Sequence, residues 1–230
     1  MCRVATHMTT FGGETLATLR EVWLMPRDIG AIVPAARHGD DVVVLVHGFL
    51  ASAGVFRPLR RRLEEETGAH VASFSHAPGA RIHRIAHALA HLVDRIPHGA
   101  RIHLVGHSLG GIVARYYVQE LGGYARVVQT ISLAAPFGGA PLASRLPVLV
   151  GSELRPGSAL LARLRRRAAE HGVAHLSIAG THDRTVPHDA ALDFPHGERV
   201  SLSGRGHNTL LFDADAATAI VERVRAASRR

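Results

Sequence analysis

Segments typical of buried strands alternate with amphipathic, helix-like segments from residue 41 to residue 228. The first strand-like segment, D-V-V-V-L-V at 41–46, is an almost continuous β-branched run that ends near a glycine. Such runs are typical of parallel strands covered on both faces. Because parallel neighbours need long crossover connections, the alternation predicts an α/β fold with a mostly parallel sheet and helices on both faces.

The other elements follow in the same rhythm. Further strands are predicted at 71–74, 102–105, 127–133, 174–179 and 199–202. Helices are predicted at 56–67, 81–96, 112–121 and 214–227. A chain of 230 residues is long enough for one buried core, so we expect a single domain over residues 1–230.

Residues 1–40 lie ahead of this alternation as an N-terminal helical extension. Four apolar residues recur there at helical spacing: Leu16, Leu19, Val22 and Trp23. They predict a helix that packs ahead of the sheet. An interfacial membrane anchor is the less favoured interpretation, because the polar positions carry Glu14, Arg20 and Glu21 rather than a basic face.

Residues 137–172 interrupt the alternation with a mixture of proline, glycine and apolar residues before a helical stretch. A long excursion in a compact fold is usually functional, so we predict a small cap-like, substrate-binding insert. The insert contains six large apolar residues: Leu142, Leu146, Val148, Leu149, Val150 and Leu154. They could bind an acyl chain or, equally well, be buried against Trp23 or the sheet.

Composition excludes several classes of protein. Cys2 is the only cysteine, so no intrachain disulfide is expected, and no apolar run is long enough for a transmembrane helix. The first residues do not form a signal peptide, which predicts a cytoplasmic protein unless the chain is a trimmed secreted one. The net charge of +8 comes entirely from arginine, but without aromatic platforms or motifs it does not indicate nucleic-acid binding.

The turn L-V-G-H-S-L-G-G at 104–111 lies between a predicted strand and a predicted helix. This is the context in which G-x-S-x-G forms a nucleophile turn, with Gly106 and Gly110 allowing the backbone to fold back on itself. Ser108 is then exposed at the carboxyl end of its strand. The amino end of the following helix favours an oxyanion nearby. We predict that Ser108 is a catalytic nucleophile.

A serine nucleophile needs a histidine base and a carboxylate that orients the base. In this fold the acid and then the histidine follow the serine, each after a strand. Of the six later histidines, His207 alone directly follows the last strand, between glycine and asparagine. Asp183 follows the preceding strand and is the predicted acid, with Asp189 and Asp193 as alternatives.

The sequence H-G-F at 47–49 follows the first strand and supplies the second half of a predicted oxyanion hole. We assign its donors to the backbone N–H groups of Phe49 and Leu109. His47 either holds this loop by hydrogen bonding or is an ordinary turn residue.

His83, His87 and His91 recur every four residues, a pattern that raises the alternative of a metal site. They form a stripe opposite the apolar face of their helix and span too much of it to bind one ion together. We therefore expect no catalytic metal.

The chain resembles the α/β-hydrolase superfamily, and more closely its bacterial serine lipases and esterases. Five sequence pieces carry the resemblance: V-H-G-F at 46–49, G-H-S-L-G-G at 106–111, S-L-A-A-P-F-G-G at 132–139, A-G-T-H-D-R-T-V-P at 179–187 and G-R-G-H at 204–207. The resemblance implies the Ser108, Asp183 and His207 triad, no organic cofactor, ester or lipid-ester substrates, and a sheet shortened to about six strands.

These features together predict a serine carboxylic-ester hydrolase of the esterase or lipase type. Thioesterase, acyltransferase, amidase and peptidase activities use the same residues and stay open. A non-catalytic binding module on the same scaffold is the alternative of a different class. The sequence does not indicate an oligomeric state.

Overall fold

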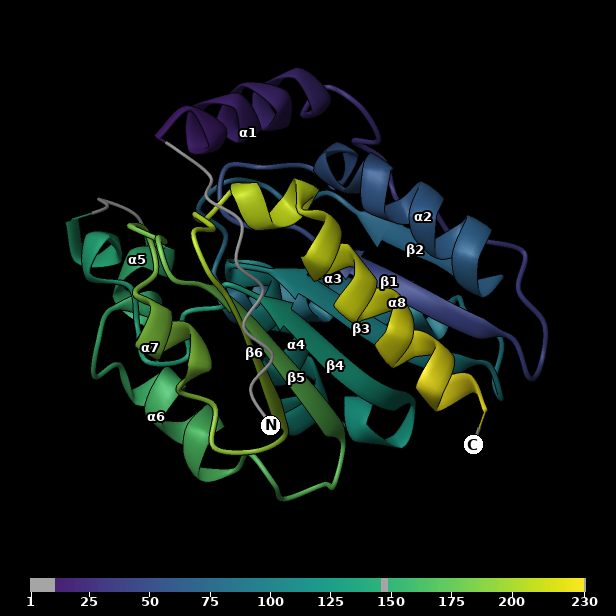
Figure 1. Cartoon of the computed structure of the whole chain (residues 1–230). Helices are drawn as coiled ribbons and strands as arrows, with labels where there is room; N and C mark the ends of the chain where they lie inside the picture. Colours follow the sequence, from purple (N-terminus) through teal and green to yellow (C-terminus); the bar gives the residue numbers. More distant parts are fainter. Residues whose placement is uncertain (1–10, 146–148, 230) are drawn as a thin grey trace.

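The computed structural model describes residues 11–145 and 149–229, and it contains one six-stranded sheet with helices on both faces (Figure 1). The strands are β1 (Asp41–Val46), β2 (His70–Phe74), β3 (Arg101–His107), β4 (Val127–Leu133), β5 (Ala174–Gly180) and β6 (Glu198–Leu202). Their spatial order is β2-β1-β3-β4-β5-β6, and all five pairings are parallel. The predicted α/β fold with about six strands is confirmed.

The helices connect these strands. They are α1 (Phe11–Leu24), α2 (Arg57–Thr67), α3 (Ile82–Asp94), α4 (Leu109–Glu120), α5 (Leu149–Leu154), α6 (Ala159–Arg166), α7 (His188–Leu192) and α8 (Ala214–Ser228). Short 3₁₀ turns lie between them: η1 (Ala53–Phe56), η2 (Gly123–Ala125), η3 (Pro141–Arg145) and η4 (Thr209–Phe212). Cys2 lies outside the described residues.

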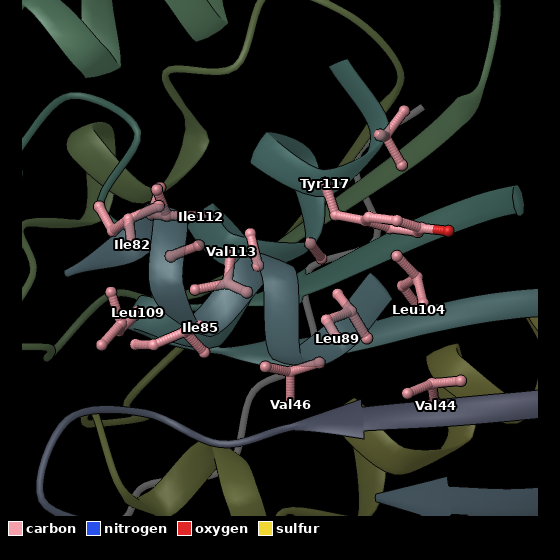
Figure 2. Packing of buried hydrophobic residues seen from close by; sticks show 14 of the residues in the cluster. Val44, Val46, Ile82, Ile85, Leu89, Leu104, Leu109, Ile112, Val113 and Tyr117 are labelled. Atoms are coloured by element: carbon pink, nitrogen blue, oxygen red, sulfur yellow. The ribbon is translucent and has the colours of Figure 1, made fainter. Parts of the chain in front are cut away.

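Apolar side chains bury both faces of the sheet. Successive residues of a strand point to opposite faces, so Val42, Val44 and Val46 of β1 join one apolar layer. Val43 and Leu45 join the other layer. Helices α3 and α4 cover the first layer, which Figure 2 shows, and α2 and α8 cover the second. The β-branched run at 41–46 is therefore a doubly covered strand, as predicted.

Part of the segment between β4 and β5 packs against the helix layer on the α4 side. Leu161 and Leu164 of α6 are buried, and the side-chain amide of Gln119 in α4 donates a hydrogen bond to the Leu164 carbonyl (3.0 Å). The buried guanidinium of Arg115 donates to the Ala168 carbonyl at 3.0 Å. The segment that contains α6 therefore packs on α4.

Helix α1 forms as predicted, but its apolar stripe does not pack ahead of the sheet. The four large apolar side chains at 16, 19, 22 and 23 are 58–68% exposed. The inward side instead carries Ala17 and Leu24, both buried, together with Glu21. The predicted direction of packing is wrong because helical periodicity identifies residues that share a face without specifying which face is buried.

Candidate active site

The carboxyl ends of parallel strands share one edge of the sheet, and all the predicted catalytic residues follow strands at that edge. Ser108 lies directly after β3, Asp183 after β5 and His207 after β6. The turn at 47–49 follows β1. In open α/β sheets this is the edge where ligands bind.

Ser108 occupies a sharp turn between β3 and α4. Its backbone has φ +52° and ψ −121°, a region that residues with a side chain rarely adopt. The Ser108 amide donates to the Leu133 carbonyl at 2.8 Å, which fixes the turn to the neighbouring strand. A Cβ added at Gly106 would approach the Gly110 carbonyl oxygen to 2.4 Å, so the two backbones require a glycine here. This strained strand-turn-helix geometry is typical of a nucleophile elbow.

Gly110→Ala is expected to destabilise the fold strongly. The new Cβ would lie 2.0 Å from the Val46 carbonyl oxygen, a backbone atom of a buried strand that cannot move away cheaply. We expect a loss of about 3 kcal/mol or more, measured by urea unfolding followed by circular dichroism. Gly30→Ala is the matched control, because a Cβ there meets nothing within 4 Å. Equal losses in the two variants would contradict the tight packing of the elbow.

The turn at 47–49 lies against the nucleophile. A Cβ added at Gly48 would come within 3.1 Å of the Ser108 Cβ. Leu109 is the first residue of α4, so its N–H has no acceptor within the helix. The two backbone segments assigned to an oxyanion hole, those of Phe49 and Leu109, thus flank Ser108. Preorganised N–H groups in this position suit an oxygen that gains negative charge during a reaction.

Asp183 and His207 are joined by a short hydrogen bond, with Nδ1 of the imidazole 2.7 Å from Oδ2 of the carboxylate. The other carboxylate oxygen, Oδ1, accepts from the backbone N–H groups of Thr185 and Val186, each at 2.8 Å. The Asp183 side chain is only 1% exposed and that of His207 9%. Three charge-assisted contacts therefore fix the carboxylate, which in turn orients the imidazole.

His107 places the His207 loop beside the nucleophile turn. Its Nε2 lies 3.1 Å from the His207 carbonyl oxygen, and the two ring centroids are 4.8 Å apart. Because His107 directly precedes Ser108, this contact brings His207 close to the serine across two strand connections. Among the described residues, no hydrogen bond joins the Ser108 hydroxyl to His207. Catalytic hydrogen bonds of this kind often tighten only in the substrate complex.

The His107 ring is neutral, because complete burial lowers its pKa well below the ordinary value. A carbonyl oxygen only accepts hydrogen bonds, so Nε2 of His107 must be protonated and donates to the His207 backbone carbonyl. Nδ1 is buried without a hydrogen-bond partner among the described residues. Sequence reasoning missed this positioning role, although the quoted G-H-S-L-G-G motif contains His107.

His47 holds the turn at 47–49 through both ring nitrogens. Nδ1 lies 2.8 Å from the Gly48 carbonyl oxygen and therefore donates, while Nε2 accepts from the His76 backbone N–H at 3.0 Å. The His76 ring stacks on that of His47 at 3.8 Å. Of the two roles considered for His47, the structure supports the loop-holding one.

Acid is expected to weaken the fold through His47. Burial lowers the pKa of His47 to about 3, whereas the unfolded chain titrates near 6.5. Between pH 6.5 and pH 3, His47 is therefore protonated in the unfolded state but not in the folded state. The free energy of unfolding then decreases as the pH falls through this range. From pH 7 to pH 4.5 this group alone costs about 3 kcal/mol.

Urea unfolding of wild type and His47→Gln at pH 7 and pH 4.5 measures this contribution. The variant should lose about 3 kcal/mol less than wild type over the same interval, since glutamine does not titrate. Comparing the two proteins cancels the contribution of His175, and it cancels the burial part of that of His107, which is the largest cause of its lowered pKa. Identical losses would show that His47 does not carry the effect.

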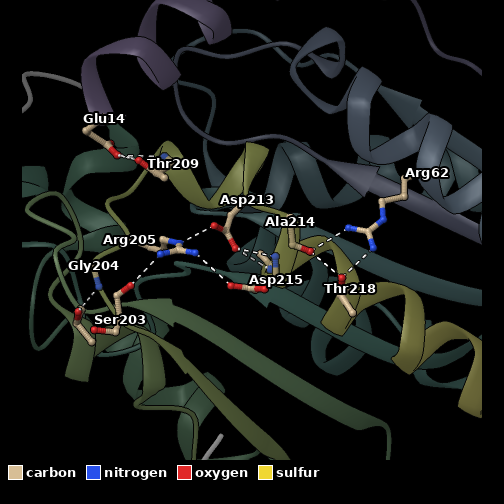
Figure 3. A network of polar contacts seen from close by, with 12 residues as sticks. Glu14, Arg62, Ser203, Gly204, Arg205, Thr209, Asp213, Ala214, Asp215 and Thr218 are labelled. Carbon is tan, nitrogen blue, oxygen red and sulfur yellow. Dashed lines mark hydrogen bonds and ion pairs between the residues drawn. The ribbon is translucent and has the colours of Figure 1, made fainter. Parts of the chain in front are cut away.

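Two sets of contacts hold the His207 loop, one from α1 at the other end of the chain and one from the start of α8 nearby (Figure 3). The Glu14 carboxylate of α1 accepts from the backbone N–H groups of Asn208 and Thr209 at 2.7 and 3.0 Å, and from the Thr209 hydroxyl at 2.6 Å. On the other side, the buried Arg205 guanidinium pairs with Asp213 and Asp215 ahead of α8 and in its first turn. The Glu14 tether could not be read from local sequence, because its partners lie 194 and 195 residues away.

The alternative acids lie elsewhere. Asp189 is fully exposed beside His188, and Asp193 pairs with Arg165.

The candidate substrate-binding residues are divided: Leu142 is half exposed, whereas Val150 and Leu154 are buried in the core. Leu146 and Val148 lie outside the described residues, as does the side chain of Leu149.

The other histidines and the possible metal ligands form no second centre in the part of the chain that the structure describes. His87 and His91 of α3 are exposed, as expected for a solvent-facing stripe. Within residues 11–145 and 149–229, no three His, Cys, Asp or Glu side chains group as a metal site would require. In the same ranges no helix has the length and apolar character needed to span a membrane.

Comparison with known proteins agrees with this architecture. Residues 43–177 match the alpha/beta hydrolase family, and the chain belongs to it. The superfamily resemblance drawn from the five sequence pieces is thereby confirmed. No curated protein matches the chain.

Three solved structures have the same fold. Monoacylglycerol lipase of Paleococcus ferrophilus has a TM-score of 0.66 and 18% identity, covering 84% of this chain and 98% of that one. Mature lipase BlEst2 of Bacillus licheniformis has a TM-score of 0.66 and 15% identity, with coverages of 85% and 96%. A structure from a study of Nitrososphaera gargenis carboxylesterases has a TM-score of 0.61 and 13% identity, with coverages of 87% and 94%.

Proposed function

We propose that this protein is a serine carboxylic-ester hydrolase acting on acyl or lipid esters through Ser108, Asp183 and His207. Membership of the alpha/beta hydrolase family supports a hydrolase. The observation that carries the finer proposal is the 2.7 Å contact between buried Asp183 and His207, in a loop that His107 ties to the elbow of Ser108. This arrangement supplies the base and its orienting acid at one edge of the sheet.

In the proposed reaction, the Ser108 hydroxyl attacks the ester carbonyl carbon while His207 Nε2 takes its proton. Asp183 keeps the other ring proton on Nδ1, so that Nε2 is free to act as the base, and it stabilises the imidazolium that forms. The backbone N–H groups of Phe49 and Leu109 donate to the tetrahedral oxyanion. His207 then returns the proton to the departing alcohol, which leaves an acyl-enzyme.

Water completes the cycle by attacking the acyl carbonyl while His207 removes its proton. Collapse of the second tetrahedral intermediate releases the carboxylic acid, and the proton returns to Ser108. Only side chains and backbone groups of this chain take part, so the proposal requires no cofactor.

The proposed substrate class rests on the chemistry of the candidate site and on the solved structures that share the fold. Two of the compared structures are described as lipases and one comes from a study of carboxylesterases. Leu142, half exposed after β4, remains the described candidate for contact with an acyl chain. We propose that acyl esters are the substrates and that the segment around Leu142 contributes to chain-length preference.

Labelling with a fluorophosphonate, which reacts with activated serines, tests the nucleophile directly. We expect one adduct, located by peptide mass spectrometry on the peptide that contains Ser108, and loss of turnover of p-nitrophenyl butyrate in parallel. A p-nitrophenyl ester series with emulsified triglyceride then defines the acyl length. An unlabelled, folded protein that hydrolyses none of these esters would favour the non-catalytic binding module.

A further inference from the structure

Helix α1 presents its apolar side to solvent and its carboxylates to the protein. In the described part of the chain nine large hydrophobic side chains are exposed, and four of them lie on this one helix: Leu16, Leu19, Val22 and Trp23. Monomeric soluble proteins rarely expose such clusters without using them. In Figure 1, α1 lies on the outside of the molecule.

The acidic residues of α1 turn towards the protein and are only partly exposed. Glu14 accepts three hydrogen bonds from the loop that follows His207, and Glu21 is turned inward, where burial raises its pKa and His207 opposes that shift. This placement removes the sequence-based objection to an interfacial helix, which rested on those two carboxylates. Apart from these two carboxylates, the charged side chains of Phe11–Arg27 are Arg20 and Arg27, beside the neutral Thr15 and Thr18.

Arginine side chains lie beside the stripe. The Arg27 guanidinium stacks on the Trp23 ring at 3.6 Å, and that of Arg20 lies over the Phe212 ring at 4.6 Å. Aromatic rings and arginines whose stems lie along apolar surface are the side chains that settle at the level of lipid headgroups. With a net charge of +8, the chain is also complementary to an anionic surface and repels a second copy of itself.

We propose that the outward stripe of α1, Leu16, Leu19, Val22 and Trp23 with Arg20 and Arg27, docks the protein onto an anionic lipid surface. The apolar side chains enter the headgroup boundary and the guanidinium groups pair with lipid phosphates. Because Glu14 joins α1 to the His207 loop, docking places the candidate active site next to the lipid. The proposal goes beyond ester hydrolysis, since docking requires no turnover.

The test uses the Ser108→Ala protein, so that binding is measured without lipid hydrolysis. Trp23 is the only tryptophan, and its emission reports on the stripe alone. With vesicles of equal phosphatidylcholine and phosphatidylglycerol, we expect the protein to sediment and the Trp23 emission to move to shorter wavelength. Partition should fall severalfold in 0.5 M NaCl, because salt screens the arginines.

Leu16→Ser with Leu19→Ser should weaken partition at least tenfold, since two exposed leucines no longer leave water for the lipid. Tyr124→Ser with Val128→Ser is the matched control, because both side chains are exposed but lie at η2 and the start of β4. Circular dichroism checks that all variants fold.

Three results would overturn the proposal. The first is equal sedimentation of the leucine variant and the control, and the second is equal partition onto vesicles of pure phosphatidylcholine. The third is a Trp23 shift that appears with protein concentration alone and accompanies a dimer in size-exclusion chromatography, which would assign the stripe to a second copy. A protein that binds vesicles but hydrolyses no ester would leave the docking surface intact and refute only the proposed function.

Discussion

Ser108→Ala should lower kcat/KM for p-nitrophenyl esters by at least about 10⁴-fold, because it removes the proposed nucleophile. The fold should stay intact. The backbone N–H of residue 108 still donates to the Leu133 carbonyl, and alanine keeps the Cβ that already fits beside Gly48. Steady-state assays measure the activity and urea unfolding measures the stability, with a change within about 1 kcal/mol expected.

Two outcomes decide this prediction. A folded Ser108→Ala protein with more than a tenth of the wild-type activity would exclude Ser108 as the nucleophile. A variant that unfolds in the assay buffer would instead show that the serine is needed for the elbow itself, contrary to the geometry described here.

Asp183→Asn should lower kcat by about 10⁴-fold while the fold and substrate binding are kept. The amide oxygen replaces Oδ1 as the acceptor for Thr185 and Val186. The amide NH₂ then faces His207 Nδ1, which must accept and so loses its proton to Nε2. In that tautomer Nε2 has no lone pair for the Ser108 proton.

The matched control is Asp189→Asn, which makes the same chemical change six residues along, on a fully exposed side chain. Its kcat should equal that of wild type, because the polar partner of this exposed carboxylate in the described part of the chain is the His188 side chain. If the two variants lost activity equally, Asp183 would not be the orienting acid.

The sheet and the elbow were predictable because each depends on a short stretch of sequence. The β-branched run at 41–46 and the glycines around Ser108 determine local backbone geometry, and parallel topology then places residues 183 and 207 at the same edge. Asp183 could be separated from its rivals only by its distance from the strand end, an argument that does not show which carboxylate meets the histidine. In the structure the carboxylate that meets His207 is that of Asp183, at 2.7 Å, which supports the proposed role.

The features that were not predictable depend on contacts between distant residues. The inward direction of Glu14 follows from hydrogen bonds to residues 208 and 209 at the far end of the chain. The tautomer of His47 is determined by the His76 backbone N–H on a different strand connection. Periodicity predicts α1 and α6 as helices, but the side that each buries depends on the surface already formed by the rest of the protein.

The position of β6 at the edge of the sheet affects which part of the protein unfolds first. β6 is an edge strand, paired on one side only, and most of its residues are not buried. The histidine that follows it thus belongs to the most easily detached margin of the sheet, while Ser108 follows an interior strand. Fraying at this margin would move His207 away from Ser108 while the rest of the molecule still looks native.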